Sequence, residues 1–147
     1  MYVRFEDPRT REGLFSVARD FRHDSHCRLF RVSRRDRRPL STAIDWLWRS
    51  TPEPPADAYE DWASRLPRTW FHAHACAHVR TALLIAQILR RYQVLLVSRA
   101  SADPGTVLYS DDVQVVIRPH REPQRHPRPL GGTPVQLWTG DRSTIRK

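Results

Sequence analysis

The chain has 147 residues, of which 39% are hydrophobic and 28% charged; this composition indicates a globular protein with one core and excludes a wholly disordered chain. Its formal net charge is +9, and arginine supplies every basic residue except Lys147. The longest apolar run, Ala82–Ala86, is far shorter than the roughly 20 residues of a membrane span, so we expect no membrane insertion.

The first half of the chain predicts one strand and three helices. Thr42 is suited to cap a helix, since Asp45 stands three positions later in the manner of a capping box. Pro52 ends that helix because proline cannot continue the helical hydrogen-bond ladder. The elements expected here are a strand over Met1–Phe5, a helix over residues 11–22, a basic connector over residues 23–39, a helix from Thr42 to Thr51 and a short helix over residues 57–66.

The second half alternates strands with one long amphipathic helix. Asp103-Pro104-Gly105 is a strong turn signal, and Ser110-Asp111-Asp112 joins two apolar runs as the turn of a hairpin. The continuous apolar run Val94–Val97 is typical of a strand that is covered on both faces. The elements expected here are a strand over Thr69–His72, a helix over His74–Tyr92, a strand over Val94–Val97 and hairpin strands over Thr106–Tyr109 and Val113–Arg118.

Together these elements predict a single α+β domain over residues 1–118, with a mixed sheet of four or five strands, helices mainly on one face and a C-terminal hairpin. The strands near residues 70 and 95 are expected to run parallel as neighbours or near neighbours, since a helix joins them. Residues 119–147 are rich in proline and arginine and almost lack apolar side chains. Such a segment buries too little to offset its ordering entropy, so a mostly disordered basic tail is expected.

Four residues with metal-binding side chains, His72, His74, Cys76 and His78, lie at the start of the long helix. Because each helical residue advances about 100°, His74 and His78 share a face while Cys76 points away from both. The two histidines have the i, i+4 spacing of metallopeptidase ligands, but Ala75 stands where the catalytic glutamate would be. We therefore expect no metal at this cluster and no cofactor elsewhere in the chain.

His78 falls on the apolar face of the long helix, which leaves two interpretations. A core histidine would hydrogen-bond to a backbone carbonyl or a tyrosine. A functional histidine would be a buried titratable group beside a candidate pocket that also includes Trp70, His74 and Tyr109. The core interpretation is favoured. No catalytic residues are predicted, since the sequence has neither a Gly-rich phosphate loop nor a GxSxG elbow.

Two basic stretches are candidate nucleic-acid contacts. The first falls in the predicted connector and the second in the tail, and both would bind phosphates without sequence specificity. The alternative is a solvated loop and an unselected extension in an arginine-rich proteome. The candidate contacts are Arg28, Arg31, Arg34, Arg35, Arg37, Arg38, Arg121, Arg125 and Arg128.

Trp46 and Trp48 form a candidate protein interface. They lie about 200° apart on one predicted helix, so both cannot face the same core. One of them is therefore expected to be exposed or to meet a partner, because tryptophan is enriched among the residues that dominate binding energy at interfaces.

The order of several motifs resembles a group of short bacterial proteins that carry no named activity. The resemblance extends over roughly two thirds of the chain. It implies that a small capping residue occupies the position of His74, which is a further argument against a metal there. The motifs are Met1-Tyr2-Val3-Arg4-Phe5, Gly13-Leu14-Phe15, Trp70-Phe71, His78-Val79-Arg80 and the run from Pro104 to Val116.

We expect a small cytoplasmic binding or accessory protein, non-enzymatic and acting through a protein partner. Cys27 and Cys76 form no CxxC pair, and the opening residues lack the apolar segment of a signal peptide, as expected in a reducing cytosol. The alternatives are a nucleic-acid-binding module, and an enzyme or small-ligand protein with its pocket at His78. Exposure of Trp46 or Trp48 would support the first hypothesis, and an open cavity at His78 would support the last.

Overall fold

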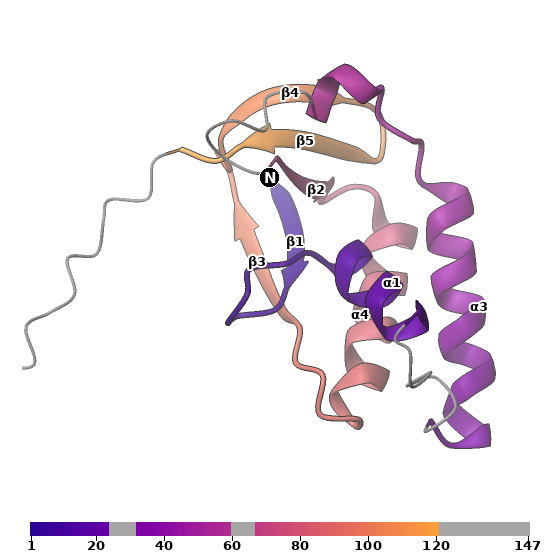
Figure 1. The fold of residues 1–147 in the computed structure, drawn as a ribbon. Coiled ribbons are helices and arrows are strands. Elements are labelled where there is room, and N and C mark those ends of the chain that lie inside the picture. The colour runs from indigo at the N-terminus through magenta and orange to yellow at the C-terminus, as the bar shows by residue number, and fades with distance from the viewer. Residues whose placement is uncertain (24–31, 60–66, 121–147) are drawn as a thin grey trace, which may run out of the picture.

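Figure 1 shows the computed structural model of the protein, which describes residues 1–23, 32–59 and 67–120. In chain order these residues form β1 (Tyr2–Glu6), α1 (Leu14–His23), α3 (Arg34–Ser50), the 3₁₀ turn η1 (Ala56–Tyr59), β2 (Arg68–His72), α4 (Cys76–Arg90), β3 (Val97–Ser101), β4 (Thr106–Ser110) and β5 (Gln114–Arg118). Within these ranges no helix combines the length and the apolar character needed to span a bilayer. The predicted tail beyond His120 and most of the predicted third helix lie outside the described residues.

The five strands form one sheet in the order β3-β1-β2-β5-β4. The α+β class, the number of strands and the C-terminal hairpin agree with the prediction. All neighbouring strands are antiparallel, whereas the sequence predicts a mixed sheet. The reason is that β1 lies between β2 and β3, so these two strands run parallel as near neighbours without pairing.

The helices α1, α3 and α4 cover one face of the sheet, and the main core lies between them and the strands (Figure 1). On α3, the buried residues Leu40, Ile44 and Leu47 follow the i, i+4, i+7 spacing of an amphipathic helix. Phe5 of β1 and Phe71 of β2 face them from the sheet. Burial of each such side chain contributes about 1.5–3 kcal/mol relative to exposure.

A second, smaller apolar cluster uses the other face of the same strands. It consists of Trp70, Val115 and Ile117, with Tyr2 packed against them. Because successive strand residues point to opposite faces, Trp70 lies on the side of the sheet away from its neighbour Phe71 and the helices. The two faces of β2 therefore belong to different clusters.

The helix α3 begins at Arg34, eight residues before the predicted start at Thr42. Ser33 caps it by accepting a hydrogen bond from the amide of Asp36. Pro39 stands inside the helix, where it removes one backbone hydrogen bond. The predicted connector over residues 23–39 is therefore wrong from Arg34 onward.

Tertiary contacts explain why the helix tolerates its proline. The carboxylate of Asp36 accepts hydrogen bonds from the Tyr92 hydroxyl at 2.9 Å and from Arg91 at 2.7 Å, both just beyond the end of α4. The hydrogen bond from Tyr92, together with that of Arg91, lowers the pKa of Asp36 below its ordinary value. The start of α3 is thus tied to the end of α4, which no local signal in the sequence predicts.

Two boundaries of the α4–β3 unit also differ from the prediction. The helix α4 begins at Cys76 rather than His74, and β3 covers Val97–Ser101 rather than Val94–Val97. Gln93 has a left-handed backbone with φ of 65°, and the amide of Val94 donates back to the carbonyl of Leu89, which ends the helix. The strand that follows is a largely exposed edge strand, so the expectation that it is covered on both faces is wrong.

Candidate binding cleft

The candidate site lies where β1 and β2 separate. Their ladder runs from Tyr2–His72 to Val3–Phe71 and includes no later pair. Beyond it Glu6, at the end of β1, forms a bridge with Gly13, which belongs to the loop before α1. This loop thus takes the place beside β1 that β2 would otherwise occupy.

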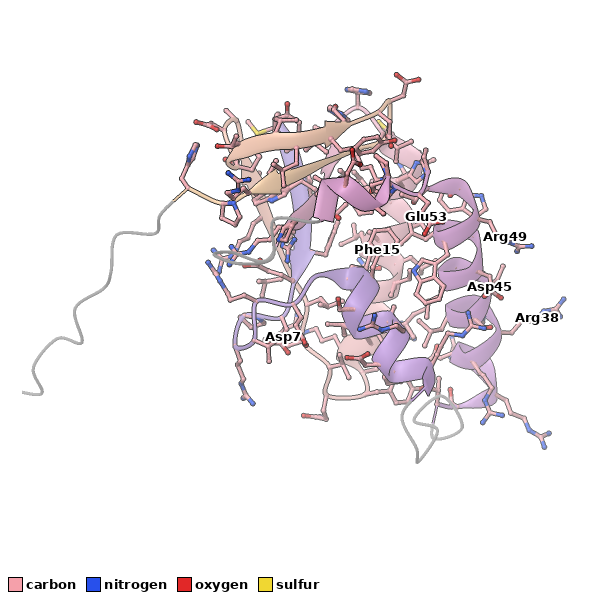
Figure 2. All side chains as sticks on the ribbon, turned by 45° about the horizontal axis from the view of Figure 1, so that its top comes forward. Asp7, Phe15, Arg38, Asp45, Arg49 and Glu53 are labelled. Carbon is pink, nitrogen blue, oxygen red and sulfur yellow. The ribbon has the colours of Figure 1, made fainter. Side chains whose placement is uncertain are left out.

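A cleft of about 950 Å³ opens at this separation. It lies between the start of α1, the end of α3 with the following residues 51–54, and the start of β2 at residues 67–69. Phe15, Trp48 and Phe71 supply aromatic walls, and the rings of Phe15 and Phe71 lie 5.8 Å apart. Figure 2 shows Phe15 between α1 and α3, with Glu53 nearby. The cleft can therefore enclose an apolar group.

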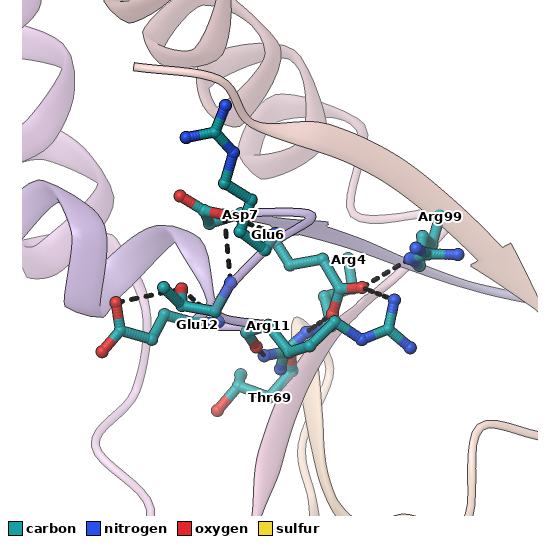
Figure 3. Close-up of polar contacts among 9 residues, drawn as sticks. Arg4, Glu6, Asp7, Arg11, Glu12, Thr69 and Arg99 are labelled. Atoms are coloured by element: carbon teal, nitrogen blue, oxygen red, sulfur yellow. Dashed lines mark hydrogen bonds and ion pairs between the residues drawn. The ribbon is translucent and has the colours of Figure 1, made fainter. Parts of the chain in front are cut away.

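Arg4 forms one wall of the cleft and joins three segments of the chain (Figure 3). Its guanidinium donates to the Glu6 carboxylate at 2.9 Å, to the Thr69 carbonyl of β2 at 3.1 Å and to the Arg11 carbonyl of the loop at 2.9 Å. The Thr69 carbonyl faces the gap that β1 leaves. Arg4 thus supplies the hydrogen bond that a continued ladder would have made.

Glu6 is the anionic centre of this cluster, with 1% of its side chain exposed. Besides Arg4 it binds Arg11 at 2.9 Å and Arg99 of β3 at 2.5 Å (Figure 3). Arg99 reaches it because the β1–β3 register sets Arg99 opposite Arg4, on the same face as Glu6. One buried carboxylate therefore holds three arginines.

Burial is the largest influence on Arg4 and lowers the pKa of its guanidinium, and the nearby charges of Arg68 and Arg11 act in the same direction. The hydrogen bond and the charge of Glu6 oppose them. Gly13 is packed against this group: a Cβ at Gly13 would lie 3.2 Å from Nη2 of Arg4. The guanidinium is thus closely enclosed as well as hydrogen-bonded.

Gln114 of β5 also lines the cleft. Its buried side-chain amide donates to the Pro52 carbonyl and to Asp111. Asp111 also accepts the backbone amides of Val113 and Gln114, as expected of turn chemistry. Burial raises the pKa of Asp111, but these hydrogen bonds outweigh it and the net pKa is lowered.

His78 is a packed residue between α3 and α4. Its Nε2 donates to the carbonyl of Ser50 at 3.1 Å, which satisfies a carbonyl at the end of α3. Its ring lies 4.9 Å from that of Trp46 and 6.2 Å from that of Phe71. This is the arrangement that the core interpretation predicts.

The other residues of the predicted pocket do not gather around His78. Trp70 lies on the opposite face of the sheet. His74 precedes α4, stacks on His72 and donates to the carbonyl of Asp112. Tyr109 pairs with Val116 in the hairpin. A pocket shared by Trp70, His74, His78 and Tyr109 is therefore not formed, and within the described ranges no group of three or more His, Cys, Asp or Glu could hold a metal ion.

Trp46 and Trp48 lie on either side of the buried Leu47, and each is 37% exposed. The exposure expected for one of them is thus found for both, since each lies about 100° from the residue that faces the core. They differ in surroundings: the ring of Trp46 lies tilted against that of His78, whereas Trp48 lines the cleft. Their role in an interface stays a prediction.

Part of the predicted basic stretch is helical. Arg34, Arg35 and Arg38 are exposed in the first turns of α3, and Arg37 donates to the carbonyl of Val32. Figure 2 shows Arg38 pointing away from the sheet on the outer side of α3. The remaining candidate contacts, Arg28, Arg31, Arg121, Arg125 and Arg128, lie outside the described residues.

Arg4, Glu6 and Arg11 were not predicted to be members of a site. A signal was present, since strand alternation places Arg4 and Glu6 on one face of an otherwise apolar strand. Comparison with protein-family models, with curated proteins and with solved structures finds no match to this chain. The cleft is therefore interpreted from its own residues.

Proposed function

We propose that the protein is a cytoplasmic, non-enzymatic binding protein that holds a segment of a partner protein in this cleft. The observation that carries the proposal is the combination of aromatic walls with arginines in one concave surface. Tryptophan and arginine are the side chains that most often dominate the binding energy of protein interfaces. In this cleft Trp48 offers an exposed ring beside Phe15 and Phe71, and Arg4 is fixed in place by Glu6.

The two tryptophans of α3 allow a matched test. Peptides selected from a randomised displayed library against the full chain would be titrated into the wild type and into Trp48→Ala and Trp46→Ala. Both residues are equally exposed, but Trp48 lines the cleft while Trp46 does not. Loss of a central aromatic contact costs about 2 kcal/mol or more, so Trp48→Ala should weaken binding by about thirtyfold.

Trp46→Ala should change the affinity by less than about threefold, which corresponds to a contact at the margin of an interface. Circular dichroism of both variants would verify that they are folded. Equal losses in the two variants, or failure to select any peptide that binds the folded chain, would contradict the proposal.

A second candidate function, nucleic-acid binding, is favoured by the placement of Arg34, Arg35 and Arg38. They gather at the N-terminal end of α3, where the helix dipole is already positive and basic residues are unfavourable for folding. Arg90 and Arg91, at the end of α4, are also exposed, and Arg91 binds Asp36 of α3. This concentration of positive charge fits contact with phosphates.

The nucleic-acid candidate predicts a change in salt dependence. Affinity for random-sequence DNA falls as salt rises, and each phosphate contact contributes about 0.9 to the steepness of log affinity against log salt. Replacement of all three arginines of α3 by glutamine should therefore make this slope shallower by about 2–3. Arg80→Gln, an exposed arginine of α4, is the control. An unchanged slope in the triple variant would exclude this end of α3 as the binding surface.

A further inference from the structure

We infer that the cleft binds an oxyanion, a carboxylate or a phosphate group, at Arg68 and Arg11 against the buried Arg4. This inference rests on the proposed function of the cleft and names the chemistry of the segment that it holds. Such a group would accept bonds from guanidinium donors, which match planar oxyanions in geometry and charge.

The place of Glu6 relative to the cleft decides which groups face a bound ligand. Arg4, Arg11 and Arg68 all line the cleft, whereas Glu6 and Arg99 do not. The carboxylate therefore lies behind Arg4, on the protein side. Both of its oxygens are already engaged, since Oε2 binds Arg4 and Oε1 binds Arg11 and Arg99. Glu6 thus fixes the arginines, although it does not itself line the cleft.

Arg68 begins β2 and lines the cleft. Its charge acts on Arg4 in a like-charge interaction that lowers the pKa of Arg4. In the part of the chain that the structure describes, no carboxylate forms an ion pair with Arg68. Arg68 therefore adds a positive charge to a wall of the cleft where Arg4 is already paired with Glu6.

Arginines outnumber glutamates among the residues that line the cleft. Its lining includes four arginines, Arg4, Arg11, Arg19 and Arg68, and two glutamates, Glu12 and Glu53. Glu6 pairs with Arg4 and Arg11, and Asp20 pairs with Arg19, so Arg68 is the lining arginine that forms no ion pair with a carboxylate of the described residues. The first turn of α1 also lines it, and that turn contains no acidic side chain. The N-terminal amides of a helix favour anions, so they add to the field of the arginines. An oxyanion beside Arg68 would offset its like-charge interaction with Arg4.

The test uses the ¹⁵N-labelled full chain titrated with inorganic phosphate and, separately, with glutarate, at constant ionic strength. We expect saturable shifts of the amides of residues 14–16 and 68–69 with at least one of the two anions. Arg68→Gln should weaken this binding by about tenfold to a hundredfold, the effect of losing a hydrogen bond to a charged group. Arg80→Gln, the exposed arginine of α4, should leave it unchanged.

Tighter binding of phosphate would indicate a phosphorylated segment, and tighter binding of glutarate would indicate acidic side chains; both support the oxyanion site. Shifts that are confined to residues 34–38, or an affinity that Arg68→Gln does not change, would overturn it. If library peptides bind in a manner that depends on Trp48 while both anions leave residues 14–16 and 68–69 unaffected, the oxyanion inference fails and the proposed function stands. The reverse pattern would contradict the proposed function and retain the anion site.

Discussion

Replacement of Glu6 by glutamine would remove the carboxylate that holds the arginine cluster together. The Arg4–Glu6 pair is buried, with side-chain exposures of 6% and 1%. Removal of one member of a buried pair costs about 3–5 kcal/mol, because the other charge stays buried and unpaired. The contacts of Arg11 and Arg99 are half-exposed and add at most about 1 kcal/mol each. The expected total is about 3–7 kcal/mol, a large part of the roughly 5–15 kcal/mol by which a domain is stable.

Urea denaturation followed by circular dichroism would measure this loss as a lower midpoint with an unchanged m-value. Glu12→Gln is the matched control, since Glu12 is exposed and, among the described residues, its carboxylate accepts a hydrogen bond from Thr10 alone. The stability of this variant should stay within about 0.5 kcal/mol of wild type. Adding Arg99→Gln to Glu6→Gln should recover part of the loss by removing a like charge. A Glu6→Gln variant as stable as Glu12→Gln would refute the view that the ion cluster holds the end of β1.

Three further changes test other parts of the fold. Gly105→Ala should destabilise the protein by about 2–4 kcal/mol in urea denaturation, because the new Cβ would lie 2.2 Å from the Arg118 carbonyl oxygen at a φ of 150°. A loss below about 1 kcal/mol would contradict this close approach of Gly105 to Arg118. Gln93→Gly should raise the thermal midpoint, since it relieves a left-handed backbone at an expected gain of about 0.5–1 kcal/mol. Asp36→Asn should be less stable than wild type at neutral pH but not at low pH. The reason is that the pKa of Asp36 is lowered in the folded protein. The stabilisation that results is present above the ordinary pKa of 3.8 and is lost as the pH falls through the folded pKa. An equal stability deficit at pH 2 and pH 7 would show that the charge of Asp36 is not responsible.

Most of the strands and the long helix were predictable because their signals are local. Short runs of apolar and aromatic residues located β1, β2 and β5, and the turn residues Ser110-Asp111-Asp112 located the hairpin. The amphipathic pattern of the long helix was a local signal too, and its apolar residues Ala82, Ile85 and Leu89 are buried in the structure. The core interpretation of His78 followed from the same pattern.

What could not be predicted depends on contacts between distant segments. The start of α3 is stabilised from the end of α4 through Tyr92 and Asp36, which are 56 positions apart. Pro39 therefore lies within the helix, although alone it indicates a break. The cleft likewise opens where β1 leaves β2, and the ion cluster beside it forms where Arg99 comes next to Glu6. Both arrangements depend on strand order. Periodicity within one segment contains no information on either arrangement.

The most direct test of the binding proposal is a map of amide chemical shifts of the ¹⁵N-labelled full chain with a library-selected peptide. The account predicts that the largest changes fall on residues 10–16, 51–54 and 67–69, the segments that line the cleft. Changes that instead centre on residues 34–38, with none at those three segments, would contradict it and would locate the binding surface at the arginine-rich end of α3.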